Sequence, residues 1–211
     1  MTTVGRWSPN KVRARVLDGT WASPPEELGG MVLLTPTSVD ITGGGSETAT
    51  TLANGSVEFT ACETLSLNGV FSADYDNYMI VCRLGSTATS SDGVFAKLRA
   101  SGTDASTNYV RQYLAVNGLN ANPNRFSAQT STVFSDTRNT LKEGFTVYMY
   151  GPFLTQPTAG RSNTIVSDGN ARFTDYAWTH GTSASYDGFS AFLSSGNYMS
   201  GLVSVYGLVG A

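Results

Sequence analysis

Hydrophobic and polar residues alternate with a period of two along most of the chain after its first thirty residues. In VFAKLRA (94–100), Val94, Ala96 and Leu98 alternate with aromatic and basic residues. In YVRQYLAV (109–116), an aliphatic set alternates with two tyrosines and an arginine. Successive side chains of a β-strand point to opposite faces, so this pattern predicts half-buried strands.

Similar alternation predicts further strands in FTVYMYGPF (145–153), ARFTDYAW (171–178), FSAFL (189–193) and SGLVSVYGLV (200–209). Clusters of Gly, Asn, Asp and Ser predict turns at 101–104, 117–118, 122–124, 168–170, 187–188 and 195–197. The segment MVLLTPTSVDI also has the character of a strand, and the low-complexity segment 43–56 after it predicts an exposed hairpin or a hinge. No segment outside the N-terminal region keeps a helical period over three turns.

Many short strands punctuated by turns need two layers, because each strand has one face to bury. The sequence therefore predicts an all-β fold, an antiparallel jelly-roll-like β-sandwich with an irregular N-terminal arm. We expect the sandwich to span residues 31–211 and the arm to span residues 1–30.

The arm combines basic and aromatic residues with little periodicity. A segment that cannot form a core of its own but carries Trp and Arg commonly docks on another surface. We therefore expect attachment through Arg6, Trp7, Arg13, Arg15 and Trp21. A disordered or self-packed terminus is the alternative.

Charge, hydropathy and cysteine content argue against several classes of function. The 211 residues carry a net charge of −3, and only 14% of them are charged, which gives no nucleic-acid footprint. No stretch reaches the roughly 20 apolar residues of a membrane helix, and the N-terminus lacks the apolar run of a secretory signal. Cys62 and Cys82 match neither a disulfide framework nor a zinc site, so we expect two free, buried thiols.

The stretch GVFSADYDNYMIVCRL (69–84) places acidic residues among tyrosines directly before a strand. An EF-hand type of calcium loop needs further ligands at fixed offsets, and they are absent. A catalytic carboxylate pair stays open, but a turn in which Asp74 and Asp76 bond to backbone N–H groups is favoured, with Tyr75 and Tyr78 packing beside the next strand. A capping role for Asp76 predicts a loss of about 1 kcal/mol on Asp76→Ala.

Other candidates for catalysis are weak. His180 is the single histidine, and its neighbours Tyr176 and Trp178 favour an aromatic patch over a catalytic base. Glycine-rich segments lack the Lys-Ser/Thr ending of a phosphate-binding loop. We therefore predict a protein that is not an enzyme, with no catalytic, cofactor-binding or metal-binding residues. The many Tyr, Phe and Trp residues fit either a core or a carbohydrate- or protein-binding surface.

Three segments of the sequence are similar to segments of a known class of proteins. GVFSADYDNYMIVCRL, FAKLRASGTDASTNYVRQYL and the closing SGLVSVYGL resemble small virion structural proteins of tailed bacteriophages, of the minor tail, fibre or head-decoration type. The likeness covers about residues 56–210. It does not reach the arm, and it matches no catalytic or receptor-contacting residue position by position.

This resemblance implies a minor tail or fibre component, assembled in the host cytoplasm, that displays a β-sandwich on the virion. The implied partners are other virion proteins bound through the arm, further copies in a homo-oligomer, and host surface carbohydrate. Nucleic acid and membrane are not among the expected partners. One alternative is a capsid decoration or head-fibre protein bound to the major capsid protein. A second is a virion carbohydrate-active enzyme that pairs acids among Asp74, Asp76, Asp175 and Asp187.

Overall fold

The computed structural model describes residues 30–88, 92–117, 120–137, 143–166, 172–193 and 196–209. These residues form 14 β-strands in one hydrogen-bonded sheet, and every strand pair in it is antiparallel. The five predicted attachment residues of the arm lie outside the described residues. No helix among the described residues is long and apolar enough to cross a membrane.

The strands in chain order are β1 (Gly30–Leu34), β2 (Ser38–Thr51), β3 (Val57–Asn68), β4 (Asn77–Ser86), β5 (Asp92–Ala100), β6 (Thr103–Asp104), β7 (Tyr109–Asn117), β8 (Asn120–Gln129), β9 (Thr132–Thr137), β10 (Glu143–Tyr150), β11 (Gln156–Val166), β12 (Arg172–Ala184), β13 (Gly188–Leu193) and β14 (Met199–Val209). Their order in the sheet is β6-β5-β13-β3-β14-β4-β10-β11-β12-β7-β8. In addition, β1 pairs with β14, β2 with β3, and β9 with β5.

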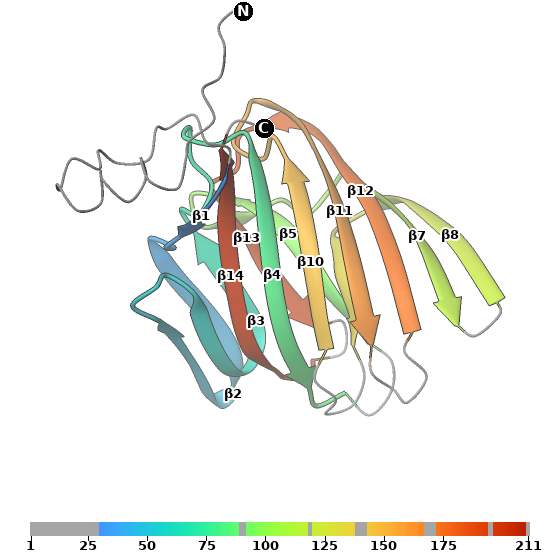
Figure 1. Ribbon diagram of the computed structural model, residues 1–211, viewed down its shortest axis with the longest axis horizontal. Coiled ribbons are helices and arrows are strands. Elements are labelled where there is room, and N and C mark those ends of the chain that lie inside the picture. Colours follow the sequence, from blue (N-terminus) through green and yellow to red (C-terminus); the bar gives the residue numbers. More distant parts are fainter. Residues whose placement is uncertain are drawn as a thin grey trace, which may run out of the picture.

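The sheet curls strongly, so that its two halves face each other. Figure 1 shows β14, β4, β10, β11 and β12 side by side, with β3, β13 and β5 behind them. Strand β9, on the rear half, contacts β10, β11 and β12 across the interior. The predicted all-β antiparallel fold is confirmed, and its two layers are the halves of one continuous curled sheet.

The two halves are joined where β14 pairs with both β3 and β4. The register between β14 and β3 shifts between Met199 and Gly201 at this junction. A Cβ atom at Gly201 would lie 2.1 Å from the carbonyl oxygen of Arg83. Glycine therefore allows the close backbone approach that a sharp bend in a sheet requires.

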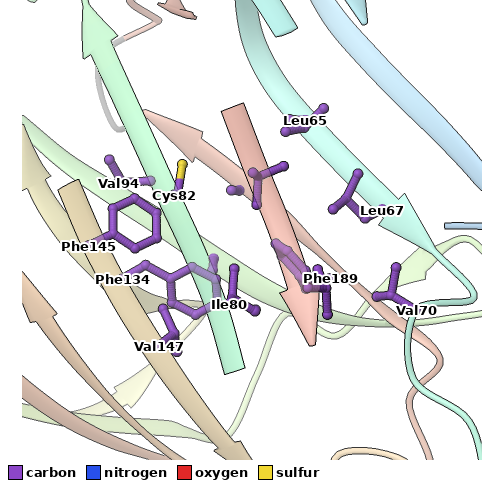
Figure 2. Packing of buried hydrophobic residues seen from close by; sticks show 14 of the residues in the cluster. Leu65, Leu67, Val70, Ile80, Cys82, Val94, Phe134, Phe145, Val147 and Phe189 are labelled. Carbon is purple, nitrogen blue, oxygen red and sulfur yellow. The ribbon is translucent and has the colours of Figure 1, made fainter. Parts of the chain in front are cut away.

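The core fills the space between the halves. Figure 2 shows part of it, with aliphatic residues of β3 and β4 beside aromatic residues of β9, β10 and β13. The ring of Phe134 on β9 lies 6.2 Å from that of Phe145, 6.3 Å from that of Trp178 and 5.7 Å from that of Phe189. These partners belong to β10, β12 and β13, so one side chain connects both halves of the sheet.

Residues 69–84 form a turn followed by β4, and the turn interpretation is confirmed in part. The Asp74 carboxylate accepts a hydrogen bond from the Ser72 hydroxyl at 3.0 Å. The buried Tyr78 hydroxyl accepts from the Ser72 N–H and donates to the Ser72 carbonyl, both at 2.8 Å. The Tyr75 ring packs edge-on against the Tyr78 ring, with centroids 6.1 Å apart.

The expected bonds from the Asp74 and Asp76 carboxylates to backbone N–H groups are wrong, since Asp74 instead accepts from the Ser72 hydroxyl. Asp76 is exposed, and the hydrogen bond it makes uses its backbone carbonyl, which accepts from the Gly151 N–H at 2.8 Å. Its carboxylate points into water and supports no backbone group. The hydroxyl of Tyr78, rather than an acidic side chain, fixes the turn.

Most predicted strands are present, but β3, β6, β8, β9 and β11 were missed and one turn is wrong. The predicted turn residues 118, 168–170 and 195 lie outside the described residues. The segment 122–124 lies inside β8 rather than in a turn. Pro123 is tolerated there because β8 is an edge strand, so its missing N–H leaves no neighbour unpaired. The segment 43–56 completes β2 and turns into β3, which confirms the hairpin over the hinge.

Both cysteines are free and buried, as predicted. Cys62 lies on β3 and Cys82 on β4, within the main hydrophobic cluster. Burial raises the pKa of the Cys82 thiol well above its ordinary value. Because the thiolate is the reactive form, Cys82 has a structural role as a small core residue.

We expect Tyr78→Phe to lower the free energy of unfolding by about 1–2 kcal/mol, because it leaves both backbone groups of Ser72 without their partner. Asp76→Ala is the matched control in the same turn, with an expected change within about 0.5 kcal/mol. Urea denaturation of both variants measures the difference. A larger loss for Asp76→Ala than for Tyr78→Phe would contradict this account of the turn.

Candidate functional site

A groove of about 250 Å³ lies between the β5–β9 edge of one half of the sheet and the β7–β8 hairpin of the other. Its lining combines aromatic, basic and acidic side chains, and consists of Asp92, Gly93, Phe95, Arg111, Tyr113, Phe126, Val133, Asp136 and Tyr176. The space is much larger than a water molecule occupies, so it can accept part of a small ligand.

Strand β7 turns its tyrosine and arginine face toward the groove. Tyr109 is fully buried, whereas the aliphatic residues Leu114 and Val116 are 44% and 36% exposed. The sequence pattern alone favours burial of the aliphatic face of such a strand. At this edge of the sheet, the interior instead holds Tyr109, half-buried Arg111 and Tyr113.

A β-bulge shapes each wall of the groove. The pairing of β7 with β8 shifts between Tyr109 and Arg111, and Ala128 in the extra segment has a φ of 53°. The pairing of β5 with β9 shifts between Val94 and Phe95. Bulges re-aim side chains and often lie next to functional sites.

Basic and aromatic side chains stack in an unbroken series that enters the groove. We call Lys97, Phe192, Phe95, Arg111, Phe126 and Tyr113 the cation–aromatic ladder. All six are half-buried.

The spacing of the ladder is regular. The Lys97 ammonium lies 5.3 Å from the Phe192 centroid, and the Phe192 ring stacks on the Phe95 ring with centroids 6.0 Å apart. The Arg111 guanidinium lies 4.9 Å from the Phe95 centroid and 5.1 Å from the Phe126 centroid. Distances below about 6 Å are those of cation–π attraction.

Gly93 makes room for the ladder. A Cβ atom on Gly93 would lie 2.7 Å from a ring carbon of Phe95. Any larger residue would push the Phe95 ring away from the Arg111 guanidinium. The glycine at the start of β5 therefore positions the ring for stacking.

Arg111 has few polar partners. Its Nη1 donates one long hydrogen bond, 3.5 Å, to the Ser131 carbonyl. Burial in the groove lowers the pKa of the Arg111 guanidinium, and Tyr176 and Tyr113 oppose this effect. The group stays protonated, since an arginine pKa is far above neutrality.

Two carboxylates also line the groove, and both are hydrogen-bonded. Asp136 accepts from the Tyr176 hydroxyl at 2.5 Å and from the Thr174 hydroxyl at 3.3 Å. Asp92 accepts from the Gly93 N–H at 2.7 Å and from the Asn197 amide at 3.5 Å. These bonds fix the orientation of the carboxylates.

A second, larger hollow of about 650 Å³ lies on the outer face of β7, β8, β11 and β12. In its lining, Asp175 makes a bidentate ion pair with Arg161, at 3.0 and 2.6 Å. Asn163 adds a third hydrogen bond to the same carboxylate, at 3.2 Å. Asp175 and Arg161 of this hollow thus bind each other.

The structure does not bring the four predicted acids together in the groove. Asp175 lies in the outer hollow, and Asp187 accepts a hydrogen bond from the Ser101 N–H. Asp74 and Asp76 lie in the turn before β4. Among the residues described, no cluster of three or more His, Cys, Asp or Glu side chains could hold a metal ion.

His180 is buried in an aromatic cluster, in agreement with the structural interpretation of this residue. Its ring lies 4.5 Å from the Tyr109 ring and 5.2 Å from the Tyr186 ring. Nδ1 is 3.2 Å from the Tyr186 hydroxyl. Desolvation lowers the His180 pKa, against a smaller opposing effect of a hydrogen bond to the Thr107 backbone.

Sequence reasoning missed the residues of the groove. A signal was present in β7, where Arg111 lies between Tyr109 and Tyr113 on one face of a strand. The sequence pattern held no comparable signal for Phe126 and Asp136, because β8 and β9 were not recognised as strands. Only the bulged pairing of distant segments brings these residues together.

Comparisons with known proteins give no function. No protein family and no curated protein matches the chain. A protein of unknown function from Shewanella oneidensis MR-1 aligns over 99% of this chain and 97% of its own, with 12% identity and a TM-score of 0.42. Domain 4 of AbnA, a GH43 extracellular arabinanase from Geobacillus stearothermophilus, solved in complex with arabinotriose, aligns over 86% of this chain and 94% of its own, with 11% identity and a TM-score of 0.32. Both TM-scores lie below 0.5, and neither likeness indicates a function.

The lowered pKa of His180 predicts a pH dependence of stability. The folded state favours the neutral ring, so its contribution is complete above the unfolded pKa of about 6.5 and is lost as the pH falls through the lower folded value. We expect the free energy of unfolding to decrease from pH 7 to pH 5, and His180→Gln to flatten that decrease. Urea denaturation at several pH values measures it. Equal slopes for both proteins would contradict the assignment.

Proposed function

We propose that the protein is a structural component of a bacteriophage virion, a minor tail or fibre protein that displays its β-sandwich on the particle. In this proposal the groove that holds the cation–aromatic ladder contacts host surface glycans. The sequence resemblance supports the placement on a virion. The groove, with its half-buried rings, supports the contact with glycans.

The observation that carries the glycan contact is the exposure of the ladder rings. Rings that only fill a core are buried, as Phe134 and Phe189 are, at 1% and 2% exposure. Phe95, Tyr113 and Phe126 are instead half-buried and line the groove, beside hydrogen-bonding groups. A sugar needs this combination, because its C–H face packs on a ring while its hydroxyl groups bond to polar neighbours.

Assembly belongs to the proposal as well. We propose that the arm binds other virion proteins and that the chain forms a homo-oligomer in the virion after assembly in the host cytoplasm. Exposed apolar side chains on the outer face support the oligomer, since Ile165 and Phe173 are 62% and 40% exposed and occupy paired positions on β11 and β12. A second copy would cover this surface.

The position of the protein on the particle tests the virion assignment. We expect electron microscopy of particles that lack the gene to show missing density on the tail or fibre. Missing density on the capsid would instead favour a decoration or head-fibre protein. Particles that keep every appendage and all their density would overturn the assignment.

Glycan binding tests the groove. We expect Phe126→Ala and Tyr113→Ala each to weaken binding to host surface polysaccharide by about tenfold or more, because each removes ring surface that a sugar would cover. Isothermal titration calorimetry measures the affinity. Leu114→Ala in the outer hollow is the matched control, with unchanged affinity expected. Equal losses for all three variants would contradict the groove as the site.

The same samples test the enzyme alternative. A glycoside hydrolase uses two carboxyl groups, and among the described residues Asp92 and Asp136 are the two that line the groove. We expect incubation with host polysaccharide to release no new reducing ends. Release that disappears in Asp136→Asn would establish the enzyme instead.

A further inference from the structure

The charge balance of Arg111 indicates which glycans fit the groove, an inference that rests on the proposed glycan contact. The guanidinium is half-buried, with the Phe95 and Phe126 rings within 5.1 Å of its central carbon. Its N–H donors lie in one plane, so rings packed on its faces leave the rim of that plane for hydrogen bonds. Of five donors, one makes the long bond to Ser131.

Two other arginines of the chain have carboxylate partners. Arg99 lies 2.7 Å from the Asp104 carboxylate and also donates to Asn68 and Ser190. Arg161 holds Asp175 with two hydrogen bonds. In the described part of the chain, Arg111 has no carboxylate within 4.0 Å.

The two groove carboxylates do not neutralise Arg111. Asp136 is held by the hydroxyls of Tyr176 and Thr174, and Asp92 by the N–H of Gly93 and the amide of Asn197. A half-buried cation without a counter-ion has lost part of its hydration and gained no ion pair. An anion at its rim would supply that pair.

We propose that the groove binds an acidic sugar, whose carboxylate is held by the rim of the Arg111 guanidinium while its ring packs on Phe126 and Tyr113. The planar fork of arginine matches a carboxylate with two parallel hydrogen bonds. The ligand class is therefore a glycan that contains uronic or sialic acid. Asp92 and Asp136 face its hydroxyl groups as hydrogen-bond acceptors.

Paired oligosaccharides test the proposal. The probes are short uronic-acid and sialic-acid oligosaccharides, each measured beside its methyl ester, which keeps the sugar skeleton and removes the charge. We expect the full-length protein to bind an acid at least about tenfold more tightly than its ester, the scale of one charge-assisted hydrogen bond. Binding of the acid should also weaken as salt is added.

Variants of Arg111 test whether this side chain causes the preference for the acid over its ester. We expect Arg111→Gln to reduce the affinity for the acid about tenfold and to leave that for the ester unchanged, and Arg111→Lys to recover only part of the loss, since lysine lacks the fork. Arg161→Gln in the outer hollow is the control and should change neither affinity. Thermal unfolding of each variant confirms that it is folded; if Arg111→Gln does not fold, Arg111→Lys and the comparison of acid with ester decide.

The outcomes separate this inference from the proposed function. An ester bound as tightly as its acid, with both weakened by Phe126→Ala, would keep the glycan groove and overturn the acidic ligand. Tighter binding of amino-sugar oligomers than of acidic ones would also overturn it. That result would mean that the Asp92 and Asp136 carboxylates, rather than Arg111, select the ligand. If no sugar of the panel binds, the glycan contact fails, and the inference fails with it.

Discussion

The packing of the two halves of one curled sheet against each other is the constraint on which the structure depends. An antiparallel sheet with one apolar face must cover that face, and here it does so with its own other half. Phe134 is central to this contact, because its ring packs on Phe145 and Trp178 of the front half and on Phe189 of the rear half. Removing that ring would open a cavity between the halves, not at their rim.

The interior differs along the curl, and the difference determines where a binding site can form. Around β3, β4 and β14 the buried side chains are mainly aliphatic, which suits a dry core. Toward β11 and β12 the interior holds Ser162, Thr164, Thr174 and His180, all at 1% exposure or less. Buried polar groups usually have partners, and here Thr174 donates to Asp136 while the Tyr186 hydroxyl lies beside Nδ1 of His180. The groove continues this polar, aromatic interior to the surface.

The alternation of side chains predicted the all-β antiparallel class and most strands, but not β3, β6, β8, β9 or β11. In β11, Gly160 stands where a large residue would be expected, because the Trp178 ring occupies the place of its Cβ at 2.2 Å. In β9, a bulge breaks the period of two. The edge strand β8 is almost wholly exposed and carries Pro123, so no buried face marks it. The groove depends on the pairing of these irregular strands, which local pattern does not reveal.

The position of the groove links binding to the stability of the fold. Phe95 belongs to the rear half of the sheet and Phe126 to the hairpin that ends the front half, and Arg111 stacks on both. The halves meet there through cation–π contacts, which are weaker than the ring packing around Phe134. A ligand that touches both walls adds contacts that exist only when the halves are closed. A ligand bound at the proposed site would therefore stabilise the curled state of the whole sheet by linkage.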